Sequence, residues 1–231
     1  MKIENPKICI PTQKINSSDT TINSSLDKYK LLESTLFFTE NTKPLSNIYN
    51  LAIEKAIKEN VDCLILVHDD VILEENPIPK LEKLFDDYDL VGVAGPSRIE
   101  LTSPALWHLM GGGFQGGHLH GCVQHKIIKK FPMGMEVVEK PKSNFGPYPH
   151  RVVMIDGVFM ALNRYAIETM RFDENCPSAF HFYDILNSID FHLKGGKVGV
   201  GDILITHESP GLREFTNDWL IGEQYFLNKY K

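Results

Sequence analysis

Residues 63–73 read Cys63-Leu64-Ile65-Leu66-Val67-His68-Asp69-Asp70-Val71-Ile72-Leu73. An uninterrupted apolar run leads into a histidine and two adjacent carboxylates, and apolar residues then resume. Such a run is typical of a strand that is covered on both faces, so the acids are expected where open α/β sheets bind ligands. A buried carboxylate needs a divalent cation, a basic side chain or backbone N–H groups as its partner. The alternative is that one acid caps the next element and the other is solvated.

Strand and helix patterns alternate along most of the chain, which predicts an α/β fold with a mixed, mainly parallel sheet flanked by helices. The ranges with strand character are 7–12, 36–39, 63–67, 90–94, 152–162 and 198–205. The ranges with helix character are 46–57, 79–85, 164–170 and 184–194. Glycine, proline and histidine are dense from 95 to 149, where we expect loops and an antiparallel excursion.

The composition restricts the class of protein. The chain has 231 residues and a net charge of −6, which gives no electrostatic footprint for nucleic acid. Its cysteines are far apart and show no metal-binding spacing. No secretory leader or membrane span is evident in the sequence, so a cytoplasmic location is expected. We expect one domain over 1–231, with a nucleotide-binding half (7–95), an acceptor-side region (96–150), a catalytic half (151–215) and a tail (216–231).

Several short motifs follow one another in a recognisable order over about residues 7 to 215. They are Pro11-Thr12, Asn41, Asn47-Ile48-Tyr49-Asn50, His68-Asp69-Asp70, Asp156-Gly157, Phe180-His181-Phe182-Tyr183-Asp184 and His207-Glu208-Ser209-Pro210-Gly211. Together they resemble the nucleotide-sugar glycosyltransferases of the GT-A fold, akin to family 2. The resemblance implies a GT-A-like (Rossmann-like) fold and transfer of a sugar, with inversion, from a nucleoside-diphosphate donor to a hydroxyl group. It implies Mn²⁺ or Mg²⁺ as cofactor, a UDP-sugar as donor, and a glycan, lipid-linked or protein acceptor.

The resemblance also implies the ligands of the metal ion. GT-A enzymes hold the ion through an acidic motif at a strand end, which makes Asp70 the expected ligand and places Asp69 near the ribose or the sugar. His68 stands where the family usually has the first aspartate, so it either contacts the nucleotide or ends the strand as a hydrogen-bonded imidazole. His207 matches a late histidine that several members supply as a further ligand, and imidazole suits Mn²⁺ better than Mg²⁺.

Two further carboxylates are candidates for roles in the transfer. Asp184 is the expected general base, because an inverting transfer needs one carboxylate to accept the proton of the acceptor hydroxyl. It can also cap the helix that it opens. Asp156 lies within an apolar run and is expected to contact the donor sugar or the acceptor. Asp190 falls on a different helix face from Asp184 and is interpreted as structural or secondary.

Pro11, Thr12, Asn41 and Asn50 match positions that surround the nucleotide in the family, although such residues also serve in ordinary turns and caps. The stretch from Gly111 to His120 lacks the ending of a phosphate-binding loop, and its histidines have solvent or the acceptor as alternatives to a metal. Trp107 and Phe114 are candidates for stacking on a sugar ring.

Two other classes of function remain as alternatives. A sugar-phosphate nucleotidyltransferase also uses carboxylates at a sheet end with a divalent metal, but residues 12–21 lack the glycine-rich loop expected after its first strand. A noncatalytic carbohydrate-binding domain of the same fold would need none of Asp70, Asp184 and His207 at these places.

Overall fold

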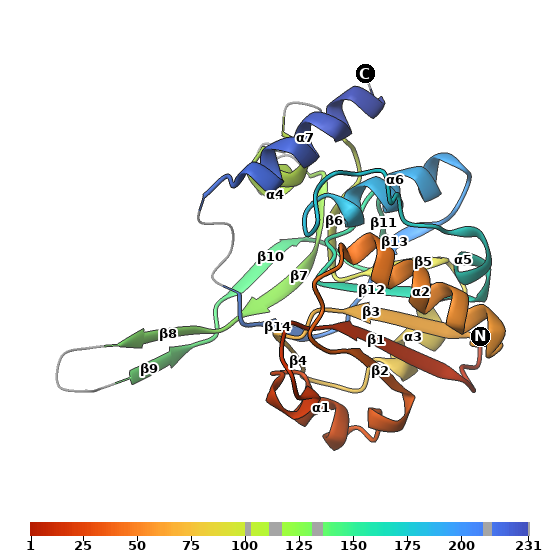
Figure 1. Cartoon of the computed structure of the whole chain (residues 1–231), viewed down its shortest axis with the longest axis vertical. Helices are drawn as coiled ribbons and strands as arrows, with labels where there is room; N and C mark the ends of the chain where they lie inside the picture. Colours follow the sequence, from red (N-terminus) through yellow and green to blue (C-terminus); the bar gives the residue numbers. More distant parts are fainter. Residues whose placement is uncertain (100–102, 111–116, 131–135, 210–213, 231) are drawn as a thin grey trace.

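The computed structural model describes residues 1–99, 103–110, 117–130, 136–209 and 214–230. Its strands form a seven-stranded sheet, a five-stranded sheet and a two-stranded ribbon (Figure 1). The strands are β1 (Pro6–Pro11), β2 (Thr35–Phe38), β3 (Cys63–Val67), β4 (Val71–Leu73), β5 (Leu90–Gly92), β6 (Ala94–Pro96), β7 (Leu119–His125), β8 (Ile127–Lys130), β9 (Glu136–Glu139), β10 (Lys142–Gly146), β11 (His150–Arg151), β12 (Phe159–Asn163), β13 (Val198–Val200) and β14 (Ile205–His207). The helices are α1 (Asn23–Lys28), α2 (Leu45–Lys58), α3 (Ile78–Leu84), α4 (Trp107–Met110), α5 (Arg164–Thr169), α6 (Tyr183–Leu193) and α7 (Asn217–Tyr230).

The large sheet has the strand order β11-β13-β5-β12-β3-β1-β2. β1 is parallel to β2 and β3, and β5 is parallel to β13. β12 is antiparallel to both β3 and β5, so β1, β2, β3, β5 and β13 share one direction. β12 and the edge strand β11 run the other way. The expected α/β fold with a mainly parallel sheet is therefore confirmed.

The apolar side chains of β3 are buried on both faces of this sheet. Ile65 and Val67 belong to one buried cluster, with α3 and α7, whereas Leu64 and Leu66 belong to a second one, with α2 and α5. Successive side chains of a strand point to opposite faces, so a strand covered on both faces carries apolar residues at every position. This explains why residues 63–67 show no polar alternation.

Two predicted strands are each divided between the two sheets. The expected strand 90–94 consists of β5 in the large sheet and β6 in the second one, and the expected strand 198–205 ends at Val200, with β14 beginning at Ile205. Gly201 donates its N–H to the carbonyl of Gly92 at 3.0 Å where both segments leave the large sheet. The antiparallel excursion expected over 95–149 is confirmed by β7 and β10, which pair in the second sheet.

The predicted strand 152–162 is wrong for its first part, because β12 begins only at Phe159. Before it, the backbone bonds to several different partners: Val153 donates to Pro96, and Asp156 donates to Ala94. The Asp156 carboxylate then accepts the N–H of Val158 at 3.0 Å, closing a turn. An apolar sequence can thus be buried without being a strand, because crossing segments satisfy its backbone groups.

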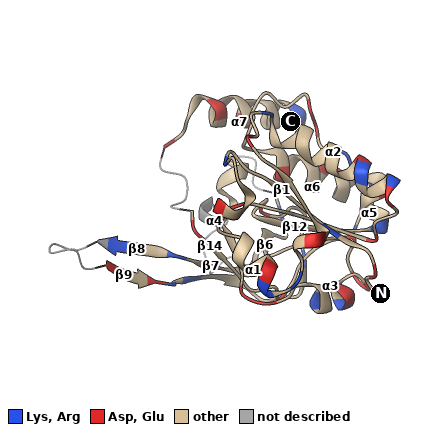
Figure 2. Cartoon of the chain, turned by 60° about the horizontal axis from the view of Figure 1, so that its bottom comes forward, with Lys and Arg blue, Asp and Glu red and all other residues tan. Residues whose placement is uncertain are grey.

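The predicted helices correspond to α2, α3, α5 and α6, whereas α1, α4 and α7 were not predicted. The β8–β9 ribbon projects from the body of the molecule (Figure 1). Figure 2 shows acidic and basic residues close together on α3 and on this ribbon, where Lys129 and Glu139 are 2.8 Å apart. In the part of the chain that the structure describes, no helix is long and apolar enough to cross a membrane.

The β3 core generates a test of the fold. Leu66 is fully buried in β3, whereas Leu193 at the end of α6 is 67% exposed. Leu66→Ala should lower the free energy of unfolding by about 2–5 kcal/mol, because it leaves a cavity between helices and sheet. Leu193→Ala should change it by less than about 0.5 kcal/mol. Urea titration of both variants measures the difference, and equal losses would contradict the assigned core.

Candidate active site

Three side chains gather beyond the end of β3 and could hold a metal ion. His68, Asp70 and His207 each offer one ligand atom, and these atoms lie within 4.8 Å of one another. The Asp70 Oδ1 atom is 3.3 Å from His207 Nε2. This oxygen is buried, yet it has no hydrogen-bond partner among the described residues. A buried carboxylate oxygen facing two imidazoles is an electron-rich group that suits a cation.

The second sheet brings His207 to this place from a distant part of the sequence. β14 pairs antiparallel with β4 so that His207 lies opposite Val71, the residue after Asp70. Glu208 also donates its N–H to the carbonyl oxygen of Asp70 at 2.9 Å. The cluster is therefore fixed by backbone pairing on both sides, and the expected proximity of Asp70 and His207 is found.

The three residues of the cluster differ in the direction and cause of their pKa shifts. Burial lowers the pKa of His68, and it opposes ionisation of both Asp70 and His207. For the latter two their mutual contact outweighs burial, so the pKa of Asp70 is lowered and that of His207 is raised. A His207 cation and an Asp70 anion thus stabilise each other, while His68 is favoured as a neutral ring.

Asp69 points away from this cluster, toward the end of β1. Its carboxylate accepts a hydrogen bond from the Thr12 hydroxyl. Asn41 joins the same region, because its backbone N–H donates to the carbonyl of Thr12 at 2.8 Å and its side chain bonds to the backbone of Lys43. Pro11 ends β1 opposite Phe38. Four of the expected nucleotide-site residues, Pro11, Thr12, Asn41 and Asp69, are therefore brought together.

Asn50 is engaged elsewhere. It lies in α2 and is buried, with its amide nitrogen donating to the carbonyl of Phe172 and its amide oxygen accepting the N–H of the same residue. Its amide also donates to Glu174. These contacts fasten α2 to the segment after α5, which accounts for a polar residue on the buried side of this helix.

Asp184 lies in the first turn of α6 and contacts the backbone that precedes β12. Its carboxylate accepts the N–H of Gly157 at 2.7 Å. Burial raises the pKa of Asp184 to about 7, the nearby Asp156 carboxylate adds to the rise, and backbone N–H donors partly offset it. Asp190, on the same helix, bonds instead to Lys229 and Tyr230. A carboxyl group with a pKa near neutral pH is well suited to exchange protons.

The start of α6 is held in an unusual conformation. Phe182, directly before Tyr183, has φ of 68°, in the left-handed region that is costly for a residue with a side chain. Its ring is buried and packs against Trp219 of α7 at a centroid distance of 5.5 Å. This packing stabilises the backbone turn that presents Tyr183 and Asp184 toward Gly157.

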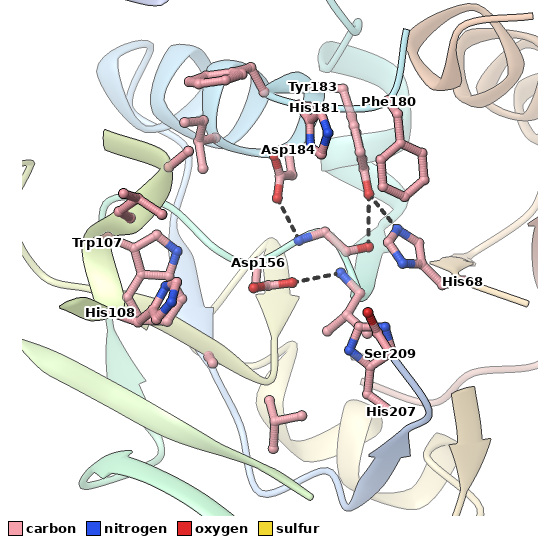
Figure 3. A pocket seen from close by; sticks show the side chains of 18 of the residues that line it. His68, Trp107, His108, Asp156, Phe180, His181, Tyr183, Asp184, His207 and Ser209 are labelled. Carbon is pink, nitrogen blue, oxygen red and sulfur yellow. Dashed lines mark hydrogen bonds between the residues drawn. The ribbon is translucent and has the colours of Figure 1, made fainter. Parts of the chain in front are cut away.

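Several of these side chains line one cavity (Figure 3). Its volume is about 670 Å³. His68, His207, Asp156 and Asp184 all line it. Trp107, a predicted sugar-stacking residue, lies here together with His108 and Trp219, which were not predicted, and with Tyr183, which was part of a motif but had no predicted role. Burial lowers the pKa of His108 and His125. The apolar and aromatic setting of Tyr183, next to Asp184 in the sequence, was the signal that could have found it.

The other histidines of the glycine-rich stretch have different surroundings. His120 stacks on His150 with ring centroids 3.6 Å apart and contacts the hydroxyl of Ser97. His125 contacts the Ser143 hydroxyl at 3.0 Å at the edge of the cavity. Residues 111–116, including Phe114, lie outside the described residues.

The match of a glycosyltransferase family model makes this chain a glycosyltransferase, and its fold is that of the GT-A class. The chain belongs to a family described as "Glycosyltransferase like family", whose model matches residues 19–229. A curated relative, Streptomycin biosynthesis protein StrF of Streptomyces griseus, is 23% identical over 210 residues, which cover 89% of this chain and 67% of StrF.

Two solved structures share the fold. A197 from STIV has a TM-score of 0.51 and 11% identity, with 93% of this chain and 99% of A197 covered. GalNAc-T7, solved with UDP, GalNAc and Mn²⁺, has a TM-score of 0.53 and 11% identity. That match covers 98% of this chain and 48% of GalNAc-T7, so the chain corresponds to about half of that protein.

Gly157 provides a test of the site geometry. A Cβ atom at this position would lie 2.2 Å from the Tyr183 hydroxyl and 2.9 Å from the Asp184 Cβ. Gly157→Ala should therefore push α6 away from the cavity, lower the free energy of unfolding by about 1–3 kcal/mol and reduce sugar transfer. Leu193→Ala is the control, since this side chain at the end of α6 is 67% exposed. Wild-type activity and stability in Gly157→Ala would contradict this packing.

Proposed function

We propose that the protein transfers a sugar, with inversion, from a nucleoside-diphosphate donor to a hydroxyl acceptor in a metal-dependent reaction. The main support for this proposal is that the candidate metal ligands lie close to the Asp184 carboxylate. His68 and His207 line the same cavity as the Asp184 carboxylate, and Asp70 lies beside the two histidines, although these residues come from three separate segments of the chain. The match of the glycosyltransferase family model over residues 19–229 favours this class over a nucleotidyltransferase or a noncatalytic domain.

The residues beyond β3 fit a divalent cation. The Asp70 Oδ1 atom, which has no hydrogen-bond partner among the described residues, and the two imidazoles provide one oxygen and two nitrogen ligands. This mixed set favours Mn²⁺ over Mg²⁺, which prefers oxygen ligands. A bound cation supplies positive charge that stabilises the diphosphate leaving group. The affinity of the site for the cation should fall at low pH. His207 is protonated when it pairs with Asp70, and a cation must displace this proton.

The nucleotide is proposed to lie along the ends of β1 and β3. Asp69 and Thr12 are linked by a hydrogen bond there, and Asn41 is joined to the backbone of Thr12. Pro11 ends the adjacent strand. The paired Thr12 and Asp69 present polar groups of the kind that bind ribose hydroxyls. Asn50 is proposed to act indirectly, because its hydrogen bonds to Phe172 hold α2 in place.

Asp184 is proposed to accept the proton of the acceptor hydroxyl. It lines the cavity together with His68 and His207, and its raised pKa of about 7 makes it a base of suitable strength near neutral pH. Asp156 is proposed to contact sugar hydroxyls, since it lines the cavity and its Oδ1 atom is held by the N–H of Val158. Trp107 lies on the cavity wall, where its ring can stack on the acceptor or on the donor sugar.

The donor and the acceptor are proposed at the level of chemical class. GalNAc-T7, which shares the fold, was solved with UDP, GalNAc and Mn²⁺, so a UDP-sugar with Mn²⁺ is the first combination to test. A glycan, a lipid-linked acceptor or a protein can each present a hydroxyl to the cavity. A cytoplasmic location would give the protein access to nucleotide sugars made there.

The metal site is tested with nucleotide binding. UDP should raise the melting temperature more with Mn²⁺ than without it, because binding to the native state alone stabilises that state. Asp70→Asn should abolish the Mn²⁺-dependent part of the shift. Asp202→Asn is the control, since its carboxylate is 63% exposed and pairs with Lys80. GDP, CMP and TDP test the choice of nucleotide, and equal shifts in the wild type and Asp70→Asn would refute the metal assignment.

The role of Asp184 is tested by substitution and pH. Asp184→Asn should reduce transfer by about 10²–10⁴-fold while Mn²⁺-dependent nucleotide binding is retained. Transfer by the wild type should fall as the pH drops below about 7, because protonation of Asp184 removes the base. Asp190→Asn should retain transfer, since Asp190 bonds to α7. Transfer at the wild-type rate in Asp184→Asn would exclude it as the base.

A further inference from the structure

Tyr183 lies between the metal cluster and the proposed base, and its hydroxyl contacts His68 and the Gly157 carbonyl, with the hydroxyl of the buried Tyr49 also beside it. The oxygen is 2.7 Å from His68 Nε2 and 3.2 Å from the carbonyl oxygen of Gly157. The ring is buried at the start of α6 and packs against Tyr49 and Phe172, with centroid distances of 5.5 and 6.2 Å. Figure 3 shows both contacts converging on the hydroxyl. The side chain is thus held in one orientation by its surroundings.

A single assignment of protons satisfies both contacts. The Gly157 carbonyl can only accept, so the Tyr183 hydroxyl donates its one proton there. The hydroxyl oxygen then accepts from His68, which requires the proton of the neutral imidazole to be on Nε2. The opposite tautomer would use the hydroxyl proton for His68 and leave the Gly157 carbonyl without this donor.

We propose that Tyr183 is a positioning residue that fixes His68 as the Nε2–H tautomer and presents the lone pair of Nδ1 to a divalent cation beside Asp70 and His207. Nε2 faces Tyr183, so Nδ1 is the ring nitrogen left for the cation. A metal-binding histidine usually donates its other N–H to an acceptor that sets the tautomer and the ring orientation. Here the acceptor is a tyrosine hydroxyl rather than a carboxylate.

The same tyrosine couples the metal site to the proposed base. The amide N–H of Gly157 donates to Asp184 at 2.7 Å, while its carbonyl receives the Tyr183 hydroxyl. Tyr183 and Asp184 are consecutive in α6, so the first turn of this helix is hydrogen-bonded to both the N–H and the carbonyl of Gly157. Movement of this turn would change the position of the base and the orientation of His68 together.

The proposal rests on the metal site of the proposed function, and its first test uses metal-free protein. Nitrogen-15 NMR of labelled histidines distinguishes the two tautomers of the neutral ring, and the His68→Gln variant identifies the His68 signals by their absence. Wild-type protein should carry the proton of His68 on Nε2. In Tyr183→Phe the ring should show a mixture of tautomers. A wild-type His68 protonated on Nδ1 would overturn the proposal whether or not the variant folds.

The second test measures Mn²⁺ binding directly by electron paramagnetic resonance titration. Tyr183→Phe should bind Mn²⁺ about 10- to 100-fold more weakly, the usual cost of losing an outer partner of a metal ligand. Tyr230→Phe is the matched control, because it also removes a partly buried tyrosine hydroxyl that donates to a backbone carbonyl; this hydroxyl lies in α7 and its second partner is the Asp190 carboxylate. Circular dichroism checks that both variants are folded.

The outcomes separate this inference from the proposed function. Equal Mn²⁺ affinity in folded Tyr183→Phe and in the wild type would overturn the role of Tyr183 and leave the metal site standing. A wild-type protein that binds no Mn²⁺ would overturn the metal site and this inference with it. Equal weakening in Tyr183→Phe and Tyr230→Phe would mean a general loss of packing and would also overturn the positioning role.

Discussion

The Gly157 residue is the point on which the geometry of the site depends. Its N–H donates to Asp184 and its carbonyl accepts from Tyr183, so the turn before β12 is fixed to the start of α6 from both sides. A side chain at this position would occupy the space of both partners. The close approach is possible because glycine lacks a Cβ, and it brings the proposed base to the cavity wall that His68 shares.

The second constraint is the pairing of strands across two sheets. β3 delivers His68 at its end, but the remaining members of the cluster depend on β4 and β14, which belong to the smaller sheet. The chain leaves the large sheet near Gly92 and again near Gly201, where these two residues are hydrogen-bonded. The smaller sheet therefore completes the site that the larger one begins, and His207 meets Asp70 although the two are far apart in sequence.

The sequence predicted most elements whose environment is uniform along their length. β3 is apolar on both faces, and α2 has a regular apolar side, so local patterns were enough to locate them. Local patterns failed at residues 152–158, whose apolar side chains are buried in an irregular segment held by Pro96 and Ala94. They also could not locate Asn50 relative to Phe172, because that contact joins segments distant in sequence. The same limit applies to Tyr183, whose partners His68 and Gly157 come from two other segments.

Asp70 and Asp184 have the same side chain, but their surroundings give them opposite chemical character. The contact with His207 keeps the pKa of Asp70 low despite burial, so this carboxylate stays anionic and available to a cation. Asp184 is buried without a cationic partner among the described residues, and Asp156 raises its pKa further. A carboxylate that binds a metal ion must remain ionised, whereas a carboxylate that acts as a base must gain and lose a proton near neutral pH. The proposed roles, metal ligand for Asp70 and base for Asp184, thus follow from the residues that surround each carboxylate.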